Sequence, residues 1–561
     1  MADENSHVDA VLIALGATGK YQMMQMVVAV IAKMAAAFQL LSNVFISAEV
    51  DHHCAPPPNG TDISRRFQNY SHVNVTYGTC SIDFWYNGTR VAQEGCIYGM
   101  VYDQPVDTSA VSQFDLVCER DSLAKLSQTL VIAGQGIGAV LTTIASDRLG
   151  RKMVLIGSNI GLMLCGLAIA YAPNYIVFAT FKFIVGGFQQ GVVAGVFTYN
   201  SELFPSQQRR LNVMSGILAW ALSAMLISPV AYLCRRFSWR TTQMVYSTVS
   251  VNAILQIWLL DESLRWLLAN GKTEQAIKVI KRAARINRKD YDDVMSVFYK
   301  AAASAQTSKH NMEDDLKKTM QEDTAEKLTL LDLLRVKRLF INSVAIWFAW
   351  FTTALGFFAL YLTSTSLSGN KYINFFLTSC MELPSLILFS VGLNRFGRRP
   401  TTALTFVLLS GGLLVRGILR SLDDTSVINV FILISSLVAM IGASGSFNGL
   451  FAYTPEIFPT NMRSQALGVS SFVGRIGGML APFTSVLADQ VKWGPGVLIG
   501  GCAFIVCLLF VILPETNGRE LPQTVGDLLK WYKPDDKTTD AEKGKGENPE
   551  EKYQVQGSST Q

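Results

Sequence analysis

Three short motifs occur twice in this chain, in the same order and at nearly the same spacing. The first copy consists of Asp147-Arg148-Leu149-Gly150-Arg151, Glu202-Leu203-Phe204-Pro205 and Glu262-Ser263, and the second of Asn394-Arg395-Phe396-Gly397-Arg398, Glu456-Ile457-Phe458-Pro459 and Glu515-Thr516. The copies are offset by 247, 254 and 253 residues. One such pair could arise by chance, but three in register indicate that the chain contains a duplicated half.

Long apolar runs surround both basic motifs and recur along most of the chain. Of the 561 residues, 50% are hydrophobic and 16% are charged, whereas a soluble domain carries about 25% charged residues. About 20 apolar residues suffice for a helix to span a bilayer. The sequence therefore predicts an all-α membrane protein with twelve spans, near residues 21–48, 123–145, 153–172, 175–199, 212–234, 241–260, 339–362, 372–393, 401–419, 427–452, 465–488 and 495–513.

The short basic loops predict the orientation of the chain. The positive-inside rule assigns the turns at Arg148 and Arg395 to the cytoplasm, and an even number of spans then places both termini there. We expect a cytoplasmic N-terminus (1–20), an N-terminal six-helix half (21–260), a cytoplasmic connection with an amphipathic helix near 272–289 (261–338), a C-terminal six-helix half (339–513) and a cytoplasmic tail (514–561). Parallel repeats of this size are typical of transporters with a site between the halves.

A polar insertion after the first span, residues 49–121, has the features of an extracellular segment. Disulfides and N-glycans both require the extracellular or luminal side. The insertion contains the cysteines Cys54, Cys80, Cys96 and Cys118, together with every Asn-x-Ser/Thr sequon of the chain, at Asn59, Asn69, Asn74 and Asn87. Four cysteines allow three pairings, and the sequence does not select one of them.

Other kinds of site find little support in the sequence. The net charge is only +5 with basic residues beside the spans, so nucleic-acid binding is not implied. All five histidines lie outside the spans, which argues against a histidine metal site or proton relay within the membrane. The segment Gly134-Gln135-Gly136-Ile137-Gly138 lies inside an apolar span, so we interpret it as close helix packing rather than a nucleotide loop. We expect no enzyme, no metal and no cofactor.

Several segments outside the duplicated motifs carry further information. They are Asp51-His52-His53-Cys54, Phe114-Asp115-Leu116-Val117-Cys118, Leu264-Arg265-Trp266-Leu267 and Leu513-Pro514-Glu515-Thr516-Asn517-Gly518. With the motifs, they make nearly the whole chain resemble the organic cation, organic anion and carnitine transporters among the solute carriers of the major facilitator superfamily. The resemblance implies a twelve-span fold of two six-helix halves, a plasma-membrane location and a small organic ion as substrate.

A site for organic ions needs aromatic faces and a few buried charges. Charges inside a span are costly unless they face a cavity or a partner, which draws attention to Glu382 and Arg475. The sequence and the resemblance together predict these substrate-binding residues: Gln39, Asn43, Phe197, Trp350, Phe357, Glu382, Phe447, Asn448, Phe451 and Arg475. Two alternatives stay open, because the aromatic residues could simply pack helices and Glu382 could form a structural ion pair with Arg475. Whether Lys33 and Lys182 face the cavity is also open.

The resemblance implies that the charges in the eighth and eleventh spans set the substrate preference. An acid in the eighth and an arginine in the eleventh, as at Glu382 and Arg475, resemble the carnitine branch. A cationic group near Glu382 and a carboxylate near Arg475 would suit a zwitterion.

The duplicated motifs are expected to form cytoplasmic gate networks that latch the two halves together in one of the two transport states. The predicted gate residues are Asp147, Arg148, Gly150, Arg151, Glu202, Arg209, Glu262, Arg265, Arg395, Gly397, Arg398, Glu456 and Arg463.

The sequence thus predicts a polyspecific transporter of organic cations or zwitterions that works by alternating access. The alternatives are an organic anion transporter and a non-transporting membrane receptor. Facilitated diffusion, exchange, and coupling to sodium or protons all remain open as driving forces, and the oligomeric state is unknown.

The sequon positions make the topology testable. If residues 49–121 face outward, glycosidase treatment should lower the apparent mass of the protein on a gel. Changing Asn59, Asn69, Asn74 and Asn87 together to Gln should abolish that shift. A shift that persists in the quadruple variant would contradict the predicted topology.

Overall fold

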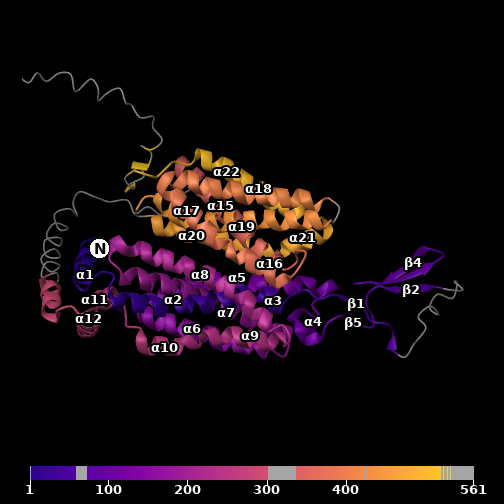
Figure 1. Cartoon of the computed structure of the whole chain (residues 1–561), viewed down its shortest axis with the longest axis horizontal. Coiled ribbons are helices and arrows are strands. Elements are labelled where there is room, and N and C mark those ends of the chain that lie inside the picture. The colour runs from indigo at the N-terminus through magenta and orange to yellow at the C-terminus, as the bar shows by residue number, and fades with distance from the viewer. Residues whose placement is uncertain are drawn as a thin grey trace, which may run out of the picture.

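The computed structural model describes residues 2–58, 73–300, 336–422, 425–460 and 462–519, with a few more between 522 and 531. Figure 1 shows two helical bundles side by side, one from the N-terminal half and one from the C-terminal half. Among the described residues, eleven helices are long and apolar enough to cross a membrane. Asn59, Asn69, residues 301–335 and nearly all of the tail after 519 lie outside the described residues.

The helices of the N-terminal bundle are α2 (Lys20–Leu41), α3 (Asn43–Ile46), α5 (Asp121–Leu149), α6 (Arg151–Ala170), α7 (Tyr175–Leu203), α8 (Arg209–Leu233), α9 (Trp239–Thr248) and α10 (Asn252–Leu259). Those of the C-terminal bundle are α15 (Lys337–Thr363), α16 (Lys371–Cys380), α17 (Glu382–Arg395), α18 (Arg398–Arg420), α19 (Ser426–Tyr453), α20 (Arg463–Leu480), α21 (Thr484–Gln490) and α22 (Gly494–Ile512).

The sixth predicted span, 241–260, differs from the other eleven. It consists of α9, a 3-10 turn (Val249–Val251) and α10, which follow one another directly, and it does not reach the apolarity of the other spans. Its polar side chains bond to neighbouring helices of the same bundle. The Nδ2 of Asn159 on α6 donates to Asn252 at 2.6 Å and to Gln256 at 3.1 Å. This run is therefore amphipathic, with its polar face turned toward the bundle.

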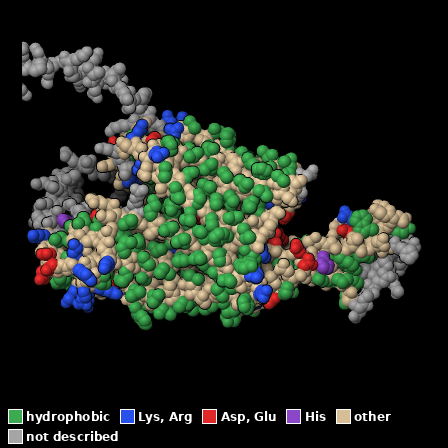
Figure 2. Space-filling model, viewed as in Figure 1, with side chains coloured by type: hydrophobic (Ala, Val, Ile, Leu, Met, Phe, Trp, Pro, Cys, Tyr) green, Lys and Arg blue, Asp and Glu red, His purple; other side chains and the backbone are tan. Residues whose placement is uncertain are grey.

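Hydrophobic side chains cover the middle of the face shown in Figure 2, and charged side chains gather at its two ends. Large apolar residues such as Ile176, Leu233 and Trp258 are more than 70% exposed, which would be costly in water and is expected next to lipid. We call the end that carries residues 49–121 the insertion end, and the end that carries the turns at Gly150 and Gly397 the basic-turn end.

The insertion folds into small β-sheets that project from the bundle (Figure 1). One antiparallel sheet pairs β1 (His52–Cys54) with β5 (Met100–Tyr102), and another has the order β2 (Asn74–Tyr77), β3 (Ile82–Tyr86) and β4 (Thr89–Glu94). Disulfides join Cys54 to Cys96 and Cys80 to Cys118. Although His52 Nε2 lies 3.7 Å from the sulfur of Cys118, a disulfide sulfur is not a thiolate ligand, so this group does not form a metal site.

The first twenty residues contain a helix that the sequence analysis did not predict, because Ala2–Ala14 form α1. Together with α11 (Leu264–Ala269) and the amphipathic α12 (Thr273–Asn287), α1 packs under the N-terminal bundle at the basic-turn end. Asp9 on α1 pairs with Arg265 and accepts a 2.8 Å hydrogen bond from Ser206. Burial favours a higher pKa for Asp9, but these two partners outweigh it and hold the pKa below its usual value.

The glycines of the Gly134–Gly138 segment allow α5 and α7 to touch through their backbones. A Cβ added to Gly134 would overlap the carbonyl of Phe183, and one added to Gly186 would overlap the carbonyl of Val131. Small residues at helix crossings allow this approach in membranes. The prediction of close helix packing for this segment is therefore confirmed.

This crossing gives a stability prediction with an internal control. Gly134→Ala and Gly186→Ala should each destabilise the protein by about 1–3 kcal/mol, because the added methyl forces the helices apart. Gly157→Ala on α6 should be neutral or stabilising by up to about 1 kcal/mol, since nothing lies within 4 Å of its added Cβ. Thermal unfolding of the purified variants measures both effects. Equal Tm values for Gly134→Ala and Gly157→Ala would contradict the close crossing.

Candidate functional site

The two halves meet along contacts that run from the insertion end to the middle of the molecule. Tyr372 on α16 lies at one such joint, where its ring stacks on Phe45 at 5.6 Å between ring centroids and its carbonyl accepts a 2.6 Å hydrogen bond from Ser228. A second joint lies between α5 and α20, where Thr129 donates to the carbonyl of Met479 at 2.8 Å. These contacts therefore join the two halves from the insertion end to the middle of the molecule.

Glu382 lies at the joint between the halves and is only 2% exposed. The helical run is interrupted here at Met381, because α16 ends at Cys380 and α17 begins at Glu382 with Pro384 in its first turn. One carboxylate oxygen of Glu382 accepts hydrogen bonds from Trp220 Nε1 at 3.0 Å and from the Tyr361 hydroxyl at 2.5 Å. Trp220 belongs to the N-terminal half and Tyr361 to the C-terminal half, so this one oxygen ties the two halves together.

Aromatic rings surround this carboxylate. Phe357 lies one turn from Tyr361 at 5.1 Å between centroids and 6.5 Å from Trp220. Phe447 of α19 lies 5.1 Å from Phe357, edge-on. Trp350 continues the cluster toward the basic-turn end, 4.7 Å from Phe451, and its Nε1 donates to Thr454 at 3.0 Å. The predicted aromatic residues of the seventh and tenth spans therefore form one continuous cluster beside Glu382.

Arg475 on α20 is the other charge predicted for the site, and it does not pair with Glu382. Its Nη1 donates to Ser471 at 3.1 Å. Its buried Nε has no hydrogen-bond partner in the part of the chain that the structure describes. The side chain lies across the joint from Gly136 of α5, where an added Cβ would come 3.8 Å from the Cδ of Arg475. A structural ion pair between Glu382 and Arg475 is therefore wrong for this conformation.

Lys33 and Lys182 occupy different surroundings. Lys33 lies beside Gly216 of α8, one turn from Trp220, and interacts electrostatically with Glu382. Lys182 is 1% exposed inside the N-terminal half, with its ammonium 5.4 Å from the centre of the Phe178 ring and no hydrogen-bond partner among the described residues. Of the two lysines, Lys33 is therefore the one near the site.

The remaining predicted site residues are scattered. Gln39 is 1% exposed and bonds to Ser247 and Gln243 of α9 inside the N-terminal half, and its role in substrate binding stays a prediction. Asn43 bonds to Ser127 at 3.4 Å near the insertion end. Phe197 is 58% exposed and Asn448 is half-buried. Sequence reasoning missed Trp220 and Tyr361, because a lone aromatic residue in an apolar span carries no distinguishing signal.

The first copy of the duplicated motifs forms a compact network at the basic-turn end. Arg151 donates to Glu202 at 2.9 Å, and Ser263 donates to the same carboxylate. Glu262 accepts the backbone N–H groups of Arg151 and Lys152 at 2.9 and 3.0 Å, which places its charge on the N-terminus of α6. Gly150 has φ +103°, and an added Cβ would overlap this carboxylate, so only glycine suits the turn.

The second copy repeats this arrangement in the C-terminal half. Arg398 pairs with Glu456 at 3.3 Å, and Thr516 donates to Glu456 at 2.6 Å. Glu515 accepts the backbone N–H groups of Arg398 and Arg399, both at 3.1 Å, at the N-terminus of α18. Gly397 has φ +94° where Gly150 has φ +103°. The duplication seen in the sequence is therefore also a duplication of this charge network.

In this conformation these networks do not connect the two halves, so the expected latch stays a prediction for one of the two transport states. In the described part of the chain, every hydrogen bond and ion pair of Arg151, Glu202, Arg398 and Glu456 joins partners of the same half. Asp147 pairs with Arg151 one turn away and is 68% exposed, so it is a peripheral member. Arg148 and Arg395 are exposed, Arg463 contacts Thr460 at 3.5 Å, and the side chain of Arg209 lies outside the description.

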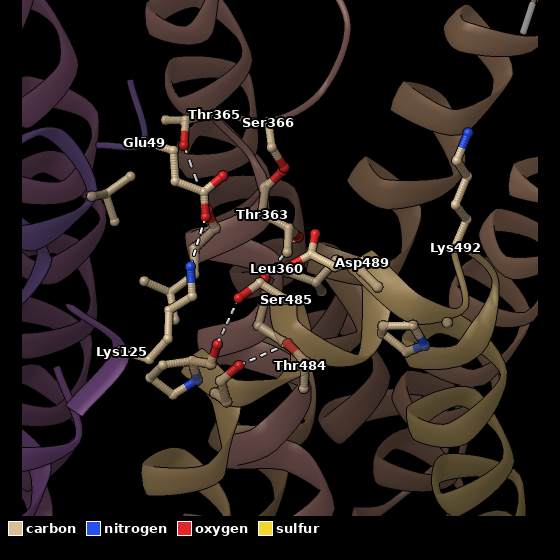
Figure 3. A pocket seen from close by; sticks show the side chains of 18 of the residues that line it. Glu49, Lys125, Leu360, Thr363, Thr365, Ser366, Thr484, Ser485, Asp489 and Lys492 are labelled. Carbon is tan, nitrogen blue, oxygen red and sulfur yellow. Dashed lines mark hydrogen bonds and ion pairs between the residues drawn. The ribbon is translucent and has the colours of Figure 1, made fainter. Parts of the chain in front are cut away.

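A cavity of about 860 Å³ opens at the insertion end, and we call it the outer pocket. It is lined by α3, by the ends of α5, α15, α18 and α22 and by the α20–α21 break, and none of Glu382, Trp220 and Arg475 lines it. Figure 3 shows Lys125 reaching Glu49 at 2.7 Å on one side of the outer pocket and Lys492 on the other. The pocket is therefore separate from the layer around Glu382.

Comparison with known proteins adds sequence relatives to this geometry. A family model described as "Sugar (and other) transporter" matches residues 73–525. Solute carrier family 22 member 16 of Xenopus laevis is 30% identical and covers 79% of this chain and 75% of its own length. The organic cation transporter protein of Drosophila melanogaster is 28% identical over 92% of this chain and 94% of its own. Organic anion transporter 3 of Rattus norvegicus is 27% identical over 94% of this chain and 96% of its own length.

A solved structure has the same fold. The xylose transporter XylE from E. coli, in a partially occluded inward-open conformation, matches 88% of this chain and 100% of its own with a TM-score of 0.60 and 15% sequence identity. This confirms the predicted twelve-helix fold of two six-helix halves, and the low identity limits the comparison to the fold.

The network around Arg151 gives a stability prediction. Glu202→Gln should destabilise the protein by about 2 kcal/mol, because it leaves the Arg151 charge, which is 14% exposed, without its main partner. Asp147→Asn should cost less than about 1 kcal/mol, because Asp147 is largely exposed. Thermal unfolding in detergent compares the two variants. A Tm loss for Asp147→Asn that equals or exceeds that of Glu202→Gln would contradict this ranking.

Proposed function

The chain belongs to the sugar (and other) transporter family and, within it, to solute carrier family 22, and from this premise we propose that it is a polyspecific organic-ion transporter of the plasma membrane that works by alternating access. The observation that carries the proposal is the central layer at the joint between the halves. There, the buried carboxylate of Glu382 lies beside a cluster of aromatic rings. The partly unpartnered guanidinium of Arg475 lies elsewhere along the same joint, across from Gly136.

The aromatic cluster suits an organic ion. The faces of Trp and Phe rings attract cations and pack against apolar groups of many shapes. Rings such as Phe357 and Phe447 meet edge to face, and an organic ion would pack against these rings once the halves move apart. Such contacts depend little on the shape of the ligand, which fits broad specificity.

We propose a zwitterion, or a cation, as the substrate. Glu382 provides the negative charge and Arg475 the positive one, and each needs a partner of opposite sign in a low-dielectric layer. A carnitine-like molecule, with a quaternary ammonium and a carboxylate, would offer both.

An organic anion is the second candidate, and the position of Lys33 favours it. Glu382 already accepts two hydrogen bonds and interacts with the ammonium of Lys33. Arg475 keeps a buried N–H without an acceptor in the described structure. If Lys33 stays with Glu382, the central layer carries one surplus positive charge, which would attract a carboxylate.

The orientation follows from the basic turns and the insertion. We propose that the turns at Gly150 and Gly397 and both termini lie in the cytoplasm and that residues 49–121 lie outside. Each charge network then holds its own half rigid at the cytoplasmic face. Transport would proceed by rocking of the halves about the joint at Tyr372 and Glu382. Facilitated diffusion, exchange, and coupling to sodium or protons are all compatible with this motion.

Substrate charge is tested by three substitutions and an uptake panel. Cells expressing the chain receive a labelled organic cation, anion and zwitterion, with and without sodium and at two external pH values. Glu382→Gln should weaken uptake of cations and zwitterions more than of anions, and Arg475→Gln should most weaken substrates with a carboxylate. The loss of one desolvated pairing costs about 2–5 kcal/mol. If the ammonium of Lys33 neutralises the carboxylate of Glu382, Lys33→Met should raise cation uptake.

Surface abundance, measured beside uptake, is the control. Losses that follow surface abundance and ignore substrate charge would mean that Glu382 and Arg475 act in folding rather than in binding. No uptake of any compound by well-expressed wild type would favour the non-transporting receptor.

A further inference from the structure

The outer pocket holds more positive charge than its own side chains neutralise. Its acidic lining consists of Glu49, Asp121 and Asp489, and its basic lining of Lys125, Lys371, Arg416, Arg420 and Lys492. Lys125 lies 2.7 Å from Glu49 and 3.0 Å from Asp121, so this lysine and these two acids form a group of their own. The four other bases are left with a single acid, Asp489.

Arg416 and Arg420 lie one turn apart on α18 and both line the outer pocket. Like charges at this spacing destabilise a helix, and Arg420 does act electrostatically against Arg416. In the described residues, neither arginine forms an ion pair or a hydrogen bond through its guanidinium. Among the described residues, no ion pair offsets this repulsion, and an anion bound beside Arg416 would offset it.

Their places on the helix distinguish the two arginines. Arg420 belongs to the last turn of α18, where the helix dipole favours a cation without any ligand. Arg416 lies one turn deeper and half-buried, inside a membrane span. A charge at this depth needs a cavity or a partner, and the cavity beside it is the outer pocket. Arg416 is therefore the residue whose placement is least explained by structure alone.

The size and composition of the cavity suit a small molecule. Its volume of about 860 Å³ lies within the range of about 300–1,000 Å³ for ligand sites. Hydroxyl groups of Thr363, Thr365 and Ser485 line it beside the charges, as Figure 3 shows. Arginine binds carboxylates and sulfonates through two parallel N–H groups.

We propose that the outer pocket is a second binding site, for an organic anion whose carboxylate or sulfonate is held by Arg416 with Arg420 beside it. This site is separate from the central layer, and it does not depend on which ion is transported. Its occupant arrives from the aqueous phase at the insertion end, where Glu49, Lys125 and Lys492 line the pocket beside apolar residues such as Leu360 and Leu413.

The test is direct binding of labelled benzoate to the purified full chain in nanodiscs of phosphatidylcholine. All variants carry Arg475→Gln, which removes the carboxylate partner of the central layer. Benzoate should still bind saturably. Arg416→Gln should raise Kd about tenfold or more, as expected for loss of one charge-assisted pairing, and Arg420→Gln should raise it less. Benzylammonium, a cation of the same shape, should not compete.

Matched controls separate binding from folding and from general charge. Arg235→Gln removes an exposed arginine that stacks on Tyr232 outside the pocket, and it should leave Kd unchanged. Arg416→Lys keeps the charge and should bind benzoate more tightly than Arg416→Gln, which keeps the test valid if the latter variant unfolds. Equal Kd values for Arg416→Gln and Arg235→Gln would overturn the proposal.

A further experiment with an anionic lipid tests whether the anionic group in the outer pocket comes from a lipid headgroup rather than from a solute. Adding phosphatidylglycerol to the nanodiscs should leave benzoate binding unchanged if the site takes a solute. Loss of benzoate binding in these nanodiscs, with a rise in Tm that requires Arg416, would overturn the proposal in favour of a lipid headgroup. Uptake by the Glu382 and Arg475 variants tests the proposed transport function separately, so either proposal can fail alone.

Discussion

A charged side chain in the interior of a bilayer is stable only where a partner offsets the loss of water, and this constraint governs the centre of the molecule. Glu382 satisfies it with two donors on one oxygen, Trp220 from one half and Tyr361 from the other. When the halves rock, at least one of these donors must move relative to the carboxylate. The charge then needs a replacement, which the substrate or Lys33 could supply. In the proposed mechanism, substrate binding and movement of the halves are thus linked through Glu382.

The same constraint explains how each half would stay rigid while the joint moves in the proposed mechanism. Glu262 and Glu515 place their carboxylates on the N-termini of α6 and α18, where unpaired N–H groups and the helix dipole stabilise a negative charge. Arg151 and Arg398 then connect these helix ends to Glu202 and Glu456. Because both networks close within one half, motion of the halves relative to each other breaks none of these bonds.

The sequence was sufficient for the fold and insufficient for much of the site, for a physical reason. Helices that cross a membrane must be long and apolar, and the duplicated motifs require particular residue types at a tight turn and a helix N-terminus, so both leave local patterns. The contacts of Glu382 come from α8 and α15. These helices are far apart in the chain, so their contacts leave no local sequence pattern. Gln39 is a residue that the sequence does single out, because a glutamine inside a span indicates a polar contact. The sequence does not identify the partner, which in this structure is Gln243.

Two positive charges, Arg475 near the centre and Arg416 in the outer pocket, lie in the same half of the molecule, and the proposed rocking motion would move both together. Arg475 on α20 and Arg416 on α18 both belong to the C-terminal bundle, so a rigid-body motion of that bundle carries them together. The opposite wall of the outer pocket, with Asn43, Glu49 and Lys125, belongs to the N-terminal bundle. The pocket therefore changes shape as the halves move, while its arginines keep their distance from Arg475. An anion held at Arg416 would move with the C-terminal half. Its distance to Glu49 and Lys125 of the N-terminal half would therefore change as the halves move.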